Sequence, residues 1–126
     1  MIYILDKALI VSMHKKQISL YGGILGIRDE GLLDSTIAAP FQTFANVELF
    51  PTIEEKAAHL VYGLIQNHAF IDGNKRTGIH AMLIFLRLNQ ITLDYTQQEL
   101  INITLEIASG NITCEKFTEW IREHIQ

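Results

Sequence analysis

The side chains best suited to chemistry are concentrated in one short stretch, which lies between the two most apolar segments of the chain. In order, the stretch reads His68-Ala69-Phe70-Ile71-Asp72-Gly73-Asn74-Lys75-Arg76. Burying so many polar groups without hydrogen-bond partners would cost several kcal/mol. These side chains therefore either face solvent or form a site.

A helix beginning at Gly73-Asn74 would make this site an anion-binding one. The first backbone N–H groups of a helix have no partner within the helix, and the positive end of its dipole lies there. Gly73 allows the backbone to approach a bound group closely. Lys75 and Arg76 are unfavourable beside the positive end of the dipole unless an anion binds between them. We expect that anion to be a phosphate.

The neighbouring side chains indicate how a bound phosphate could react. A neutral histidine such as His68 is the natural general base near pH 7. Asp72 could ligate Mg²⁺ on the phosphate or orient His68, and Phe70 is expected to turn inward and fix the loop. These residues alone are equally compatible with a solvated loop between helices. Asp72 would then cap a helix, and Lys75 and Arg76 would extend their stems along the surface.

Two apolar helices are expected to hold this stretch in place. Thr52 and Glu55 form a capping-box pattern, which predicts a helix continuing to about His68. The next helix is predicted over residues 74–88, and its residues 79–86 are apolar nearly all round, as in a buried central helix. The two helices should form a buried antiparallel pair joined by the polar stretch.

Further helices are expected from their caps and their apolar periodicity. Their predicted caps are Asp6, Asp29, Thr96 and Thr113. The first should end near Gln17, and the second should stop before Pro40. A small flap or hairpin is expected near residues 20–28, and residues 41–51 are expected to be loop. The sequence thus predicts an all-α fold of about six helices, in a single domain over residues 1–126.

Composition narrows the possible functions. The chain has 126 residues, of which 48% are hydrophobic and 19% charged, as in an ordered domain. Its net charge of -4 argues against a direct nucleic-acid partner. The single cysteine, Cys114, excludes an internal disulfide and is typical of a reducing compartment. Without an apolar run of roughly 18 residues, we expect a cytoplasmic protein with no membrane partner.

The other candidate side chains favour structural roles. His59 and His80 lie in apolar helices and are expected to be core or groove residues. His14 and His124 are expected at the surface, and Arg28 is expected only to help cap the following helix. No group of histidines, cysteines and carboxylates has the spacing of a zinc site, so no structural metal is expected.

The polar stretch resembles the signature of the Fic/Doc (Fido) superfamily, which is His-x-Phe-x-Asp-(Gly or Ala)-Asn-(Gly or Lys)-Arg. All fixed positions are filled, and Lys75, where Fic enzymes carry glycine, is similar to the Doc branch, the death-on-curing toxins of toxin–antitoxin modules. The resemblance also covers Tyr21-Gly22-Gly23, Gly26-Ile27-Arg28-Asp29 and Gly31-Leu32-Leu33-Asp34-Ser35.

This resemblance implies an ATP-dependent transferase with a compact Fido fold. Doc toxins transfer the γ-phosphate of ATP to a threonine of translation elongation factor Tu and halt translation, whereas most Fic relatives transfer AMP to a hydroxyl group. His68 would accept the proton of the target hydroxyl, and Asp72 would position His68 or hold Mg²⁺. The phosphate would be bound by Gly73, Asn74, Lys75 and Arg76.

Two departures from the Fic pattern favour phosphate transfer over AMP transfer. Lys75 fills the room that glycine would leave for an α-phosphate and adds a charge suited to a terminal phosphate. Fic enzymes often carry a second arginine three residues after the first, and that position here is Ile79. AMP transfer and a catalytically inactive binding module remain the alternatives. A toxin ribonuclease is disfavoured because it would need a basic surface.

The resemblance also predicts how the protein interacts with others. Many Fic proteins carry an inhibitory helix marked by Ser or Thr four residues before Glu, and no Glu of this chain has that pattern. Inhibition would then come from a separate antitoxin whose tail folds as a helix against the toxin. The segment Tyr21-Gly22-Gly23 would belong to a flap that docks the target protein.

Overall fold

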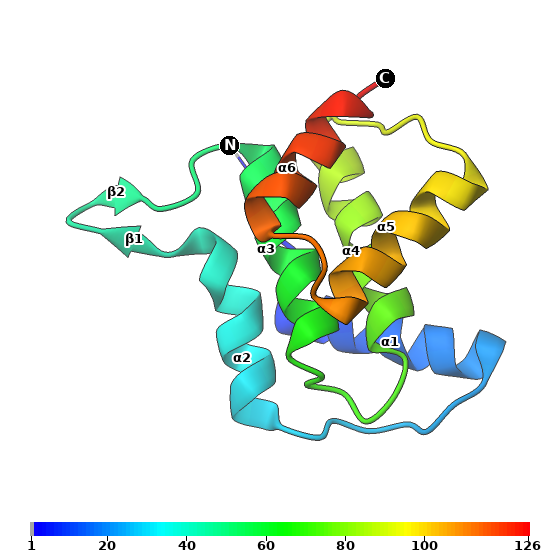
Figure 1. The fold of residues 1–126 in the computed structure, drawn as a ribbon. Coiled ribbons are helices and arrows are strands. Elements are labelled where there is room, and N and C mark those ends of the chain that lie inside the picture. Colours follow the sequence, from blue (N-terminus) through cyan, green and yellow to red (C-terminus); the bar gives the residue numbers. More distant parts are fainter. Residues whose placement is uncertain (1) are drawn as a thin grey trace.

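The computed structural model describes residues 2–126, which fold into helices and one short hairpin (Figure 1). The expectation of a mostly helical chain with six helices is confirmed. The helices are α1 (Lys7–Tyr21), α2 (Glu30–Ala38), α3 (Ile53–Gln66), α4 (Asn74–Leu88), α5 (Gln97–Ser109) and α6 (Cys114–Glu123). The 3₁₀ turn η1 (Ala39–Phe41) leads into strands β1 (Thr43–Phe44) and β2 (Val47–Glu48). No helix in the described part is long and apolar enough to cross a membrane.

Local capping sets where most helices begin. The side chains of the predicted caps each accept a backbone N–H three residues later, and both Thr52 and Thr96 form complete capping boxes. Helix α4 begins differently. Its N-cap is Gly73, which has a left-handed φ of 75° and supplies no side-chain acceptor. The first N–H groups of α4 therefore lack the side-chain acceptor that caps each of the other five helices.

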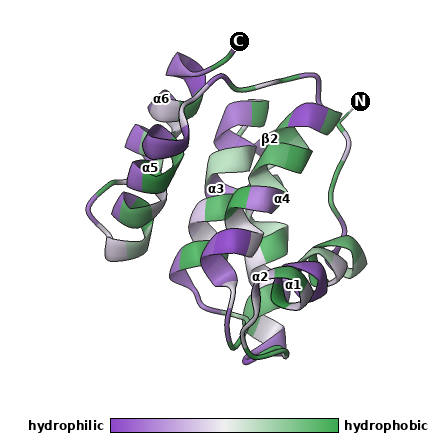
Figure 2. Ribbon diagram, turned by 90° about the vertical axis from the view of Figure 1, so that its right-hand side faces the viewer, coloured by the Kyte–Doolittle hydropathy of each residue, from purple (hydrophilic) through white to green (hydrophobic). Residues whose placement is uncertain are grey.

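Helices α3 and α4 form the central antiparallel pair (Figure 1). Leu60 and Leu64 of α3 and Met82 and Phe85 of α4 are buried in the core. Helices α5 and α6 lie on one side of the pair and α1 on the other (Figure 2). This burial places the short connection between α3 and α4 at one end of the molecule, where its side chains reach solvent.

The two-stranded hairpin lies at residues 43–48, whereas the segment near residues 20–28, where a flap or hairpin was expected, contains no strand pair. Thr43 pairs with Glu48 and Phe44 with Val47 in antiparallel register. The turn residues Ala45 and Asn46 both have positive φ, 52° and 65°. This is the backbone of a two-residue type I′ hairpin turn. Because glycine is absent from the turn, the sequence predicted only a loop here.

Residues 22–29 form an extended segment after α1, which continues to Tyr21 rather than ending near Gln17. Gly22, Gly23 and Gly26 all have positive φ. These glycines direct the chain along the α3–α4 connection instead of folding it back on itself. Its backbone consequently pairs with that connection through the bridge between Ile27 and Phe70.

A buried lysine fixes the base of the hairpin. Lys56 of α3 is only 1% exposed. Its ammonium donates to the carbonyl oxygen of Phe50 and lies 3.0 Å from a carboxylate oxygen of Glu48. The tip of the hairpin is open to solvent, with Phe44 75% exposed and Val47 66% exposed.

Candidate active site

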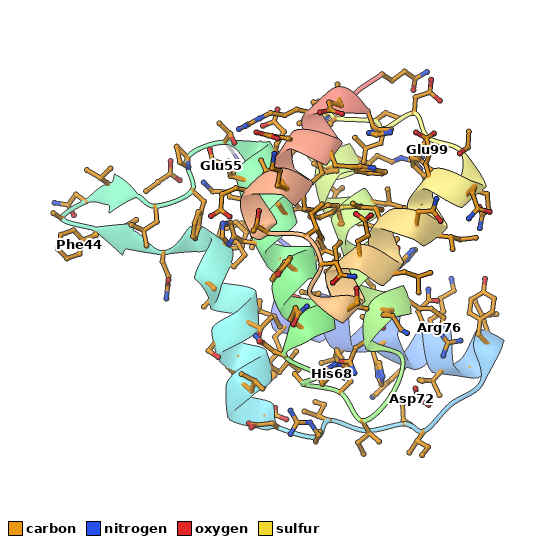
Figure 3. All side chains as sticks on the ribbon, in the orientation of Figure 1. Phe44, Glu55, His68, Asp72, Arg76 and Glu99 are labelled. Carbon is orange, nitrogen blue, oxygen red and sulfur yellow. The ribbon has the colours of Figure 1, made fainter. Side chains whose placement is uncertain are left out.

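The connection between α3 and α4 surrounds a hollow of about 260 Å³. We call residues 67–73 the motif loop. The side chains of His68, Asp72 and Arg76 are gathered at this end of the molecule (Figure 3). The hollow is lined by His68, Ile71, Asp72, Gly73, Asn74, Lys75 and Arg76. The predicted site residues of the polar stretch thus meet there, except Phe70, which points inward and is 1% exposed.

Asn74 holds the motif loop from within. Its side chain is 7% exposed; its oxygen accepts the backbone N–H of Phe70 at 3.1 Å, and its nitrogen donates to the carbonyl of Phe70 at 3.0 Å. Because the amide is engaged in this way, it supports the loop rather than reaching into the hollow. Asn74 can still offer an anion its backbone N–H in the first turn of α4.

Asp72 presents an exposed carboxylate whose two oxygens accept backbone N–H groups. One oxygen lies 3.2 Å from the nitrogen of Ile24 and the other 2.8 Å from the nitrogen of Gly73. These hydrogen bonds, first that of Ile24 and then that of Gly73, hold the pKa of the Asp72 carboxyl below its ordinary value. The group is therefore ionised at neutral pH and suited to a hard cation.

The donor set fits a magnesium ion that is shared with a phosphate. Asp72 is the acidic side chain of the hollow, and residues 2–126 contain no group of three or more His, Cys, Asp and Glu side chains able to hold a metal. Mg²⁺ commonly takes one or two carboxylates and fills its other positions with water and phosphate oxygens. Within residues 2–126, no hydrogen bond joins Asp72 to His68.

His14 is a site residue that the sequence analysis missed, because its expected surface position is wrong. It is 1% exposed, and its ring stacks on that of Phe70 with centroids 3.8 Å apart and planes 6° apart. Its Nε2 lies 2.7 Å from the carbonyl oxygen of Asp72 and donates to it, since a carbonyl can only accept. His14 follows Ile10 by four residues and Met13 by one on the buried face of α1, a periodicity that could have indicated burial.

Arg28 also belongs to this site, whereas the sequence predicted only a contribution to capping α2. Its Nε donates to the carbonyl oxygen of His68 at 2.6 Å, and its Nη2 donates to that of Asn67 at 3.0 Å. Asp29 alone provides the α2 cap, by accepting the N–H of Leu32. The exposed His68 itself has a left-handed φ of 50°.

The expected flap residues lie beside the start of α4. Arg76 donates from Nη2 to the carbonyl of Gly22 at 3.0 Å, and its guanidinium lies 5.6 Å from the ring centroid of Tyr21. A Cβ added at Gly23 would lie 2.7 Å from a carboxylate oxygen of Asp72. Glycine is favoured at position 23 because its φ is 119° and because a Cβ there would displace the Asp72 carboxylate.

A second, mostly apolar groove of about 580 Å³ adjoins the hollow and shares Lys75 and Arg76 with it. It lies between the C-terminal end of α1, helix α4 and helix α5. Ile101 and Leu105 on its α5 side are 42% and 55% exposed. The remaining lining residues are Gln17, Tyr21, Ile79, His80, Leu83, Gln97, Leu100 and Thr104.

The other histidines lie away from the hollow. His80 lines the apolar groove, and the half-buried His59 stacks on Phe50, in agreement with the expected core or groove positions. His124 was expected at the surface, but its side chain is only 15% exposed. Its ring nitrogens lie 2.6 Å from the carbonyl oxygen of Trp120 and 2.8 Å from a carboxylate oxygen of Glu99.

Comparison with known families agrees with this geometry. The model of the Fic/DOC family matches residues 4–86, a range that contains the extended segment, the motif loop and most of α4. The chain therefore belongs to the Fic/DOC family.

Two relatives lie on the Doc side of that family. The chain is 40% identical to "Toxin Doc" of Mycolicibacterium smegmatis over 91 residues, which cover 71% of this chain and 70% of the relative. It is 31% identical to "Protein kinase doc" of Escherichia phage P1 over 113 residues, which cover 90% of this chain and 88% of the relative.

Proposed function

We propose that this protein is a Doc-like toxin that transfers the γ-phosphate of ATP to a threonine hydroxyl of a target protein, elongation factor Tu. The observation that carries the proposal is the hollow itself, in which His68 faces the uncapped start of α4 together with Lys75 and Arg76. The similarity to a relative named as a protein kinase supports phosphate transfer. The cytoplasm would be the site of action, because that is where bacterial translation occurs.

In this mechanism His68 acts as the general base. The exposed imidazole accepts the proton of the threonine hydroxyl while the hydroxyl oxygen attacks the γ-phosphorus. The bond between the γ-phosphorus and the bridging oxygen breaks, and ADP leaves with that oxygen. The products are phosphothreonine, ADP and a proton, which His68 later returns to solvent.

The start of α4 would bind the phosphates of ATP. The backbone N–H of Asn74 lies at the positive end of the helix dipole, whereas that of Gly73 donates to Asp72 and would have to leave that carboxylate to bind a phosphate. Lys75 is exposed and free to reach a terminal phosphate. Arg76 is anchored by the carbonyl of Gly22, which directs its guanidinium and leaves other N–H groups for an anion. Together these donors would stabilise the charge that develops during transfer.

Asp72 would hold Mg²⁺ against the phosphates, because its carboxylate is exposed and ionised. When bound, the ion would neutralise phosphate charge and help to fix the position of the nucleotide. The backbone bonds from Ile24 and Gly73 keep the carboxylate at the edge of the hollow. Asp72 would in this way link the extended segment to the nucleotide site.

Ile79 and Lys75 favour phosphate transfer over AMP transfer. Ile79 lies in the lining of the apolar groove, where a second arginine would be needed to hold another phosphate. The alkyl stem and charge of Lys75 occupy the position at which a glycine would admit an α-phosphate against bare backbone. AMP transfer is therefore the second candidate reaction, and the test below distinguishes it from phosphate transfer by the mass that is added.

A separate antitoxin would control the activity, as the similarity to a protein named as a toxin suggests. The apolar groove along α5 would receive the helical tail of this antitoxin, because Ile101 and Leu105 expose apolar surface there. A helix in the groove would lie against Lys75 and Arg76. It would thereby restrict access to the phosphate-binding residues.

The test is incubation of the purified protein with ATP, Mg²⁺ and elongation factor Tu, followed by intact-mass spectrometry of the factor. We expect a gain of one phosphate, abolished in His68→Ala and retained in the matched control His124→Ala. The ring of His124 lies away from the hollow, where its nitrogens are bonded to Trp120 and Glu99. A gain of one AMP would establish AMP transfer instead, and an unmodified factor would reject this target.

A further inference from the structure

The backbone of His68 has a conformation that histidine rarely adopts. Its φ is 50°, in the left-handed region where a Cβ crowds the backbone. Asn67 is the C-cap of α3, so His68 occupies the next position, at which helices most often place glycine. Non-glycine residues persist in this region when surrounding contacts hold them there. The structure therefore must contain contacts that hold His68 in place.

The guanidinium of Arg28 supplies such contacts. Its Nε lies 2.6 Å from the carbonyl oxygen of His68, and its Nη2 lies 3.0 Å from that of Asn67. These carbonyls lie at the end of α3, where the helix has no further N–H groups to offer and where a cation is favoured by the dipole. The planar fork of arginine can bond two neighbouring oxygens at once, which an ammonium cannot do with the same geometry.

Arg28 is itself held by its backbone. The backbone N–H groups of Arg28 and Asp29 both donate to the carbonyl of Ala69, at 2.8 Å and 3.1 Å. Ile71 donates in turn to the carbonyl of Gly26 at 3.1 Å. The backbone hydrogen bonds of Gly26, Arg28 and Asp29 thus pair this segment with the motif loop independently of the Arg28 side chain. This backbone pairing places the guanidinium within hydrogen-bond distance of the carbonyl oxygens of Asn67 and His68.

We propose that Arg28 is a positioning residue for His68. It fixes the left-handed backbone of His68 and so directs the imidazole toward the hollow, without touching ATP or the target. This proposal rests on the proposed function, in which His68 is the general base. A base that is displaced by about 1 Å loses on the order of 100-fold in rate, although the binding of substrate is preserved.

Kinetics of the Arg28 variants test the proposal. In Arg28→Gln we expect the kcat for phosphate transfer from ATP to elongation factor Tu to fall by about 10- to 100-fold, with the KM for ATP within about twofold of the wild-type value. Arg28→Lys should lie between the two, because it keeps the charge and loses the fork. The matched control is Arg87→Gln, which changes an exposed arginine in the last turn of α4.

A backbone measurement separates this proposal from a purely structural role and from the proposed function. In the ¹⁵N relaxation of Arg28→Gln, we expect exchange broadening confined to residues 67–70, while the rest of the protein stays folded and the variant still binds ATP. If Arg28→Gln shows this broadening but the wild-type protein transfers no phosphate, the result would support the positioning role and reject the proposed function. Transfer that needs His68 but is unaffected in Arg28→Gln would reject the positioning role alone. Loss of ATP binding together with broadening throughout the protein would also reject the positioning role, because Arg28 would then be needed for the fold as a whole.

Discussion

The motif loop and the hairpin at residues 43–48 both project from the helical body, but they are held in opposite ways. The motif loop has external partners along its length: Arg28 at its start, the extended segment beside it, and Asn74 and His14 beneath it. The hairpin is held by its own strand pair and, at its base, by Lys56. The motif loop is therefore fixed mainly by contacts with other segments, whereas the hairpin is fixed mainly by its own strand pair.

The side chains displayed by the two elements differ accordingly. The motif loop exposes polar groups, His68 and Asp72, on a backbone that is held by hydrogen bonds from Arg28, Asn74 and the extended segment. The hairpin exposes the apolar side chains of Phe44 and Val47 at its tip. A reaction requires side chains held within a fraction of an ångström, so external support of the backbone is the expected property of the loop that carries chemistry.

The largest expected effect comes from removing the internal support of the motif loop. Asn74→Ala leaves the buried N–H and carbonyl of Phe70 without partners and should lower the free energy of unfolding by about 2–4 kcal/mol. Asn74→Asp should cost less, because its carboxylate still accepts the N–H. Urea unfolding followed by circular dichroism measures both. A loss below about 1 kcal/mol in Asn74→Ala would show that the loop does not depend on this amide.

The second prediction separates the two contacts of His14. His14→Phe preserves an aromatic ring against Phe70 but loses the hydrogen bond to the carbonyl of Asp72. We expect the free energy of unfolding to fall by about 1 kcal/mol, the typical cost of losing a part-buried hydrogen bond. His14→Ala, which loses the stacking as well, should be less stable still. Equal melting temperatures of the wild type and His14→Phe would show that this hydrogen bond does not stabilise the fold.

A smaller effect is expected at the base of the hairpin. Glu48→Gln removes the carboxylate beside the buried ammonium of Lys56, and Lys56→Met removes the ammonium itself. Glu48 is half-exposed, so we expect Glu48→Gln to cost about 1 kcal/mol, whereas Lys56→Met should be nearly neutral because an apolar chain suits a buried position. Chemical denaturation of the two variants gives the comparison. If Lys56→Met proved the more damaging change, the hairpin would need the ion pair after all.

The smallest expected effect is a pH dependence at the edge of the motif loop. The pKa of Asp72 is lowered in the folded protein from its ordinary value of 3.8. Its contribution to folding is therefore present above that value and is lost as the pH falls through the lowered one. The amide proton of Ile24, which Asp72 accepts, should report this titration by NMR with a midpoint below 3.8. Asp72→Asn should abolish the transition, and a midpoint above 3.8 would contradict the bond.

The parts of the structure that the sequence predicted depend on local signals. The capping boxes at Thr52 and Thr96 fix helix starts through residues only three positions apart, and the bounds of α4 agree with the apolar pattern of residues 74–88. The polar stretch likewise gathers around one hollow because its members are consecutive.

The missed features depend on contacts between distant residues. His14 is buried by Phe70 and Asp72, which lie far along the chain, and its neighbours Lys15 and Lys16 give a surface pattern. The bonds of Arg28 to Asn67 and His68 similarly join positions about 40 residues apart. Local patterns carry no information about such pairs, since only the packing of α1 and α2 against the central pair brings them together.

Because the backbone of His68 is left-handed, the residue that would be most stable at this position differs from the residue that the reaction requires. Glycine would adopt this φ without strain, so His68→Gly should recover on the order of 1 kcal/mol while removing the imidazole. A library randomised at position 68 and sorted for thermal stability alone should accordingly enrich glycine. The same library sorted for phosphate transfer should return histidine, so the two selections would pull this position in opposite directions.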